Sequence, residues 1–249
     1  MTGRAAQSQR TVRGTIRRRL LVNALVDPDE AAERLPAGVR PHVTPEGTVV
    51  GCCMLEIEGI RPAGVPVALG QRLRAVAHRI SVEWEDGSGG TEIGVYVPIR
   101  HTDSRLAAVL GGRWFPGVHE RARIEVSSSG LELRWASEPL DATHFGMRAE
   151  VHDRADAAAG AACDPVGATC LGASVGLSPD RRGRLEAARM EPSHRDARLV
   201  TVDVLESNFI DSFSTAVISN SFLMCDADVE WTRAAAPAIV SGGTPARRS

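Results

Sequence analysis

Two histidines in the middle of the chain are placed to do acid–base chemistry. His101 follows a predicted strand and precedes a predicted helix, and such element ends commonly line pockets. His119 lies in a turn after that helix, next to Glu120. An unperturbed imidazole titrates near pH 6.5, so either ring could act as a general acid or base, with Glu120 beside one of them as a further candidate. The competing interpretation of His119 is a loop histidine that hydrogen-bonds the backbone, and His101 could act as a ligand as well as a base.

Arginine is the other candidate for chemistry, because it supplies all the fixed positive charge. All 29 basic residues are arginine, and the sequence contains no lysine. Arg100 ends a predicted strand, and Arg113 lies beside Trp114. A guanidinium can hold a carboxylate through two parallel hydrogen bonds, so Arg100, Arg113 and the neighbouring Trp114 are candidate substrate-binding residues. Arg113 could equally be a surface arginine paired with Glu120.

Two further polar residues have simpler structural interpretations. His78 alternates with Val76, Ile80 and Val82 in a predicted strand, so it shares their apolar face. We expect a buried core histidine there in preference to a catalytic one, with substrate binding as the functional alternative. Asp103 precedes the second predicted helix and is expected to cap it.

Composition and motifs exclude several classes of function. A formal net charge of −2 and a pI of about 6.4 do not favour nucleic acid or an anionic membrane as a partner. No apolar stretch approaches the roughly 20 residues of a membrane span, and the N-terminus lacks the apolar segment of a signal peptide, so we expect a cytoplasmic protein. The cysteines form no CxxC pair, and the histidines form no HxH or HExxH pair. We therefore expect buried thiols, no metal and no cofactor.

Strand signals dominate the chain. Apolar runs and alternating patterns predict strands over residues 20–26, 48–57, 74–84, 92–99, 121–127, 130–136, 147–153, 185–190, 199–207 and 222–231. The turn at 86–90 makes the third and fourth of these a hairpin, and a turn at 128–129 makes the fifth and sixth another. The pattern predicts a mainly β protein with a barrel-like or sandwich-like domain.

Helices are few and short in this interpretation. Asp27 and Pro28 predict a helix start, and a second helix is predicted over 104–110. Residues 155–162 could form a third helix or a loop, and the glycine-rich stretch 160–176 is interpreted as a connection or lid. We expect a disordered arm over 1–14, one domain over 15–233 and a disordered tail over 234–249.

Four segments, taken in order, resemble the acetoacetate decarboxylase-like superfamily, in particular its uncharacterised bacterial branch. They are RRRLLVNALVDPDEAAERLP, then GQRLRAVAHRISVEW with GTEIGVYVPIRHTDSRLAAVLGGRWFPG, then LGASVGLSPDRRGRLEAARM, and finally FLMCDADVEW. Together they cover most of residues 15–232. The resemblance implies a bent antiparallel β-barrel, closed or nearly closed, with a small-molecule pocket inside it.

The resemblance also implies where relatives carry out catalysis. Their pocket lysine condenses with a keto acid, and the lysine pair follows an aromatic–proline step. Here that step is Phe115-Pro116, and Gly117 and Val118 occupy the lysine places, so neither can form an imine. Relatives hold the substrate carboxylate with an arginine before the first strand, which corresponds to Arg17. Their two pocket glutamates have no counterpart in this sequence.

These observations support two main hypotheses about function. The first is a small-molecule enzyme of this fold that works without a Schiff base: a lyase, decarboxylase, hydratase or cyclase acting on a keto- or carboxylate-bearing substrate, in specialised metabolism. Arg17 or Arg113 would fix the anion, and His119 or His101 would move a proton. The alternative is a non-catalytic barrel that binds a small ligand. A third, weaker hypothesis is a structural protein that forms homo-oligomers through exposed edge strands.

Overall fold

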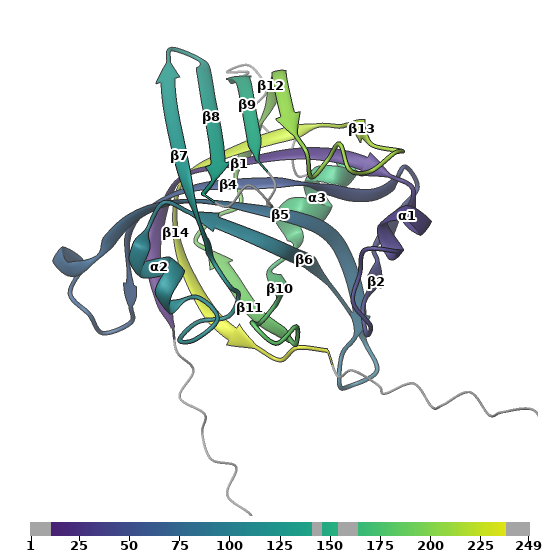
Figure 1. The fold of residues 1–249 in the computed structure, drawn as a ribbon, viewed down its shortest axis with the longest axis horizontal. Coiled ribbons are helices and arrows are strands. Elements are labelled where there is room, and N and C mark those ends of the chain that lie inside the picture. The colour runs from purple at the N-terminus through teal and green to yellow at the C-terminus, as the bar shows by residue number, and fades with distance from the viewer. Residues whose placement is uncertain (1–10, 141–145, 154–163, 238–249) are drawn as a thin grey trace, which may run out of the picture.

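The computed structural model describes residues 11–140, 146–153 and 164–237. The strands are β1 (Val12–Val26), β2 (Arg40–Pro41), β3 (Val43–Thr44), β4 (Gly47–Pro62), β5 (Gln71–Glu85), β6 (Thr91–Thr102), β7 (Glu120–Ser129), β8 (Glu132–Pro139), β9 (Met147–Asp153), β10 (Val175–Pro179), β11 (Leu185–Pro192), β12 (Ala197–Ser207), β13 (Val217–Ile218) and β14 (Ser221–Ala234). The helices are α1 (Pro28–Ala32), the 3₁₀ turn η1 (Val67–Leu69), α2 (Arg105–Leu110) and α3 (Pro165–Gly172). The protein is mainly β with few short helices, as the sequence predicts (Figure 1).

The strands form one large, strongly bent sheet that returns on itself. The pairings run β1–β4–β5–β6–β10–β11–β14, and β14 pairs with β1 again. Most pairings are antiparallel, as expected, and β6 pairs in parallel with both β10 and β7. The first half of β6 lies beside β10 (at 94–96), and its end lies beside β7 (at 101–102). Strand β6 therefore changes partner within its length, and the sheet splits at that point.

A second group of strands packs on the outside of this bent sheet. Strands β7, β8, β9 and β12 lie side by side and project at the top of Figure 1. Their inner face carries Trp135, Ala149 and Val151, which are buried with Met54 and Val76 of β4 and β5 in the main hydrophobic core. Both faces of β4 and β5 are thus covered, one by this layer and the other by the interior of the bent sheet.

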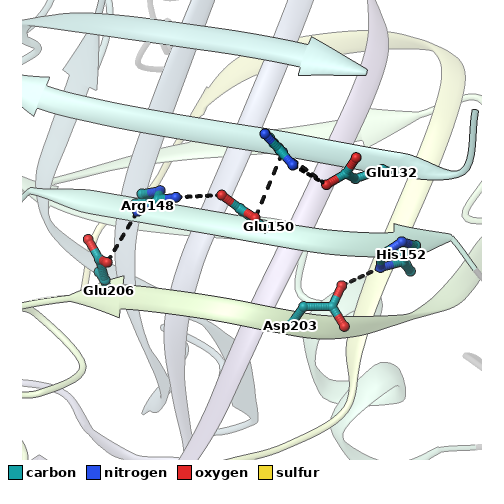
Figure 2. A network of polar contacts seen from close by, with 7 residues as sticks. Glu132, Arg148, Glu150, His152, Asp203 and Glu206 are labelled. Atoms are coloured by element: carbon teal, nitrogen blue, oxygen red, sulfur yellow. Dashed lines mark hydrogen bonds and ion pairs between the residues drawn. The ribbon is translucent and has the colours of Figure 1, made fainter. Parts of the chain in front are cut away.

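The outer face of the second layer is polar, as the alternation of a half-exposed strand requires. Figure 2 shows a ladder of side chains along β8, β9 and β12: Arg148 contacts Glu150 (2.5 Å) and Glu206 (3.4 Å), and His152 pairs with Asp203. Exposed pairs of this kind contribute little to stability individually.

The structure tests the predicted starts of the first two helices. Asp27 caps α1, with its Oδ1 accepting from Asp29 N at 2.8 Å and Pro28 at the first position, which confirms the predicted helix start. The cap of α2 is Ser104, whose Oγ accepts from Ala107 N; the prediction of Asp103 as the cap was wrong. The Asp103 carboxylate accepts instead from the Arg74 backbone N–H at 2.8 Å.

Element ends also differ from those predicted. Strand β1 begins at Val12, inside the expected arm over 1–14, and β14 extends to Ala234. Part of the stretch interpreted as a connection, 160–176, forms α3 and the start of β10. The possible helix over 155–162 falls outside the described residues. None of the helices in the described ranges is long and apolar enough to cross a membrane.

Candidate functional site

A cavity of about 440 Å³ lies inside the bent sheet, beneath α2 and the loop that follows it. Its walls come from β1, β4, β5, β6, β11 and β14 on one side and from α2 on the other. Cavities of roughly 300–1,000 Å³ are typical of small-molecule sites. Three of the residues singled out from the sequence line it: Arg100, Trp114 and His119.

Arg100 lies where the pairing partner of β6 changes from β10 to β7 and the sheet splits. Its side chain lines the cavity at this point. Its Nε donates to the Oγ of the buried Ser178 on β10 at 3.1 Å. Among the residues that the structure describes, no carboxylate forms an ion pair with this guanidinium. Burial lowers the pKa of Arg100 to about 10, so the side chain remains a cation at neutral pH.

His119 follows α2 in the loop that covers the cavity. Its Nδ1 lies 3.1 Å from the Gly117 carbonyl oxygen, an arrangement in which Nδ1–H donates and Nε2 keeps its lone pair. Burial, and then the nearby Arg100 cation, lower the pKa of His119 to about 4, so the ring is neutral at pH 7. The ring fits because residue 111 is glycine: a Cβ there would lie 2.4 Å from His119 Nδ1.

Gly117 brings the backbone close to Arg100. It adopts a φ of +88°, which side-chain-bearing residues rarely take, and its N–H donates to Glu186 Oε2 at 3.2 Å. A Cβ at position 117 would lie 3.0 Å from Arg100 Nε. The space that a side chain at 117 would enter is therefore already occupied by the guanidinium.

The two other candidate histidines lie on the opposite face of the sheet from the cavity. His101 follows Arg100 in β6, and adjacent strand residues point to opposite faces. His101 and His78 are both fully buried, with ring centroids 5.3 Å apart and edge to face. His78 Nδ1 also lies 3.3 Å from Cys52 Sγ. The prediction of a buried histidine at position 78 is confirmed.

The remaining candidates lie outside the cavity lining. Arg17 is exposed on the outer surface, where it pairs with Glu58 (2.8 Å) and Asp226 (3.0 Å). Arg113 is exposed, with Nη1 3.5 Å from the Val109 carbonyl. Glu120 is half-buried at the start of β7. The structure thus brings Arg100, His119 and Trp114 together in the cavity lining, of which Arg17, Arg113 and Glu120 are not part.

Sequence reasoning missed two polar residues that support the site. Ser178 and Glu186 face each other across the β10–β11 pairing and hold Arg100 and the Gly117 backbone respectively. Both fall in a segment that the resemblance covers, but a lone serine and a lone glutamate in short strands carry no distinguishing signal. A third missed residue is Arg79, which is buried on the inner face of β5 with Nη1 3.3 Å from Cys170 Sγ of α3.

Comparisons with known proteins bear on the fold. No family model matches the sequence, and no curated protein matches it closely enough to count as a relative. Among solved structures, acetoacetate decarboxylase from Legionella pneumophila is similar with a TM-score of 0.61 and 14% identity, over 89% of this chain and 84% of that one.

Two further solved structures are similar to this chain to about the same degree. An acetoacetate decarboxylase-like enzyme from Sphingomonas wittichii RW1 gives a TM-score of 0.59 at 14% identity, over 89% of this chain and 90% of that one. The enduracididine biosynthesis enzyme MppR gives a TM-score of 0.59 at 13% identity, over 91% of this chain and 86% of that one. The protein therefore has the fold of acetoacetate decarboxylase, which these solved structures share.

Proposed function

We propose that the protein is a small-molecule enzyme that binds a carboxylate-bearing substrate at Arg100 and moves a proton with His119, without forming an imine. One observation carries the proposal: a cation with no carboxylate partner among the described residues and a neutral imidazole line the same mostly apolar cavity. A buried charge is costly unless it is paired, so the Arg100 site favours an anion supplied by the ligand. The fold supports the same conclusion, because the neighbours named above are described as enzymes.

Arg100 and His119 are coupled electrostatically, and this coupling suggests how the substrate would prepare the site. The Arg100 cation is the second cause of the low pKa of His119, after burial. A carboxylate bound to Arg100 would cancel much of that field, and the pKa of His119 would rise toward its ordinary value. A pKa nearer the working pH makes a better general base. The free protein would thus hold a weak base that becomes stronger when the anion binds.

The chemistry that fits this pair is removal of a proton from the carbon next to a carbonyl. His119 Nε2 would accept the proton, and Arg100 would stabilise the negative charge that develops on the substrate oxygens. Lyase, decarboxylase, hydratase and cyclase reactions on keto acids can all begin at or pass through such an enolate. Trp114, also in the lining, would contribute an apolar surface against the bound molecule.

The non-catalytic alternative also has an observation in its favour. With a pKa of about 4, His119 is a weak base in the free protein, and a ligand that left it neutral would simply be held. In that case the protein would be a binding module for small acids, and Arg100 would supply affinity alone.

Proton exchange with solvent separates these two functions. A panel of 2-oxo and 3-oxo acids would be incubated with the protein in D₂O, and loss of the signal of the proton next to the carbonyl would be followed by NMR. We expect exchange with the wild type and with the exposed control Arg113→Met. His119→Gln should lower the exchange rate by about 100-fold or more, in the range that a general base contributes. Acids that bind without exchanging would overturn the enzymatic proposal and support the binding module.

A further inference from the structure

The walls of the cavity are apolar over nearly their whole extent. Leu55, Ile57, Leu73 and Phe115 line it together with Leu110 of α2 and Trp231 of β14. A small polar keto acid bound at Arg100 would leave most of this surface in contact with water. Apolar surface is stabilised when a ligand covers it, by about 25 cal/mol for each Å² removed from water. The walls therefore favour a ligand with an apolar body.

Among the residues that the structure describes in the cavity lining, Arg100 is the cation best placed to bind an anion. Arg61 is the other arginine in the lining, but its guanidinium is already engaged by the backbone, with Nη1 2.8 Å from Gly59 O and Nε 3.1 Å from Val65 O. Arg100 donates through Nε to the neutral Ser178 hydroxyl. One cation at the polar end and apolar walls elsewhere match a monocarboxylate better than a dicarboxylate or a phosphorylated compound.

We infer that the substrate class is monocarboxylic acids with an apolar body of medium length, aliphatic or aromatic. This inference rests on the proposed function, because it assumes that the substrate anion binds at Arg100. The carboxylate lies against the Arg100 guanidinium beside His119, and the apolar body extends beneath α2 between Leu73 and Trp231.

A chain-length series tests the inference directly. Affinities of acetate, butanoate, hexanoate, octanoate and pyruvate would be measured by isothermal titration calorimetry at pH 7. We expect the affinity to rise about fourfold for each added methylene until the cavity is filled, which corresponds to about 0.8 kcal/mol for each buried CH₂. Pyruvate should bind no better than acetate.

A pair of variants on α2 provides the matched control. Ala107 lines the cavity, whereas the adjacent Ala108 is not part of the lining. Ala107→Leu should weaken binding of the longest acids about tenfold and leave acetate unchanged, because it shortens the apolar space. Ala108→Leu should leave the whole series unchanged. Equal effects of the two variants would contradict the placement of the apolar body beneath α2.

The inference and the proposed function fail in different ways. If acetate and pyruvate bind as tightly as octanoate, and Arg100→Met weakens all of them, the apolar substrate class is wrong while the anion site at Arg100 stands. If Arg100→Met leaves every affinity unchanged, the proposed function itself is overturned.

Discussion

Replacement of Arg100 should raise the pKa of His119. The change Arg100→Met keeps a long apolar side chain in place and removes the cation. Burial is the larger cause of the drop from 6.5 to about 4, and the Arg100 charge is the second. Removal of the charge should therefore raise the pKa of His119 toward its ordinary value without reaching it, because burial still lowers the pKa in the variant.

The assay is an NMR titration of the histidine Cε1 protons between pH 3 and 8, within the range where the fold persists. The His119 resonance would be identified by its loss in His119→Gln. Arg113→Met serves as a control, because Arg113 is exposed and lies outside the cavity lining. A His119 pKa near 6.5 in the wild type, or one that does not change in Arg100→Met, would refute the electrostatic coupling between the two residues.

Three further predictions concern stability and geometry. The pKa of His119 is lower in the native protein than in the unfolded chain, so the free energy of unfolding should fall as the pH falls from about 6.5 to about 4. The loss should be at most about 3 kcal/mol relative to His119→Gln, measured by chemical denaturation at several pH values. Gly111→Ala should displace the His119 ring, since its Cβ would lie 2.4 Å from Nδ1, and should lower any His119-dependent rate while circular dichroism stays native. Trp135→Ala should lower the free energy of unfolding, measured with denaturant, by about 3–5 kcal/mol because Trp135 is buried between the two layers. The control His152→Asn, at an exposed position, should lower it by less than about 1 kcal/mol. Equal losses in the two variants would contradict the layered core.

Much of the sheet could be predicted because its strands carry a local signal. The β5–β6 hairpin is a clear case: two patterned runs flank the turn at 86–90, and Asp86 accepts there from Ser88 N and Gly90 N. Strand β10 and helix α3 were missed for physical reasons. Val175–Pro179 has only five residues and ends in Ser-Pro, and α3 contains two glycines, so neither has a strong intrinsic preference. Both form because they are buried by the rest of the fold.

The site was only partly predictable. Strand alternation places Arg100 and His101 on opposite faces of β6, but both faces are covered by protein, so the sequence does not indicate which one borders a cavity. That choice depends on the split in the sheet where β6 changes partner, which follows from long-range pairing with β7 and β10. The Arg17 position followed from the resemblance, yet here its guanidinium pairs with two surface carboxylates.

The most direct test of the proposed site is a crystal structure of the protein with a medium-chain carboxylate bound. We predict that both carboxylate oxygens lie within hydrogen-bonding distance of the Arg100 guanidinium, with the His119 ring beside them and the chain beneath α2. A carboxylate bound instead at Arg17 or Arg113, with the cavity beside Arg100 left unfilled, would contradict the proposed site.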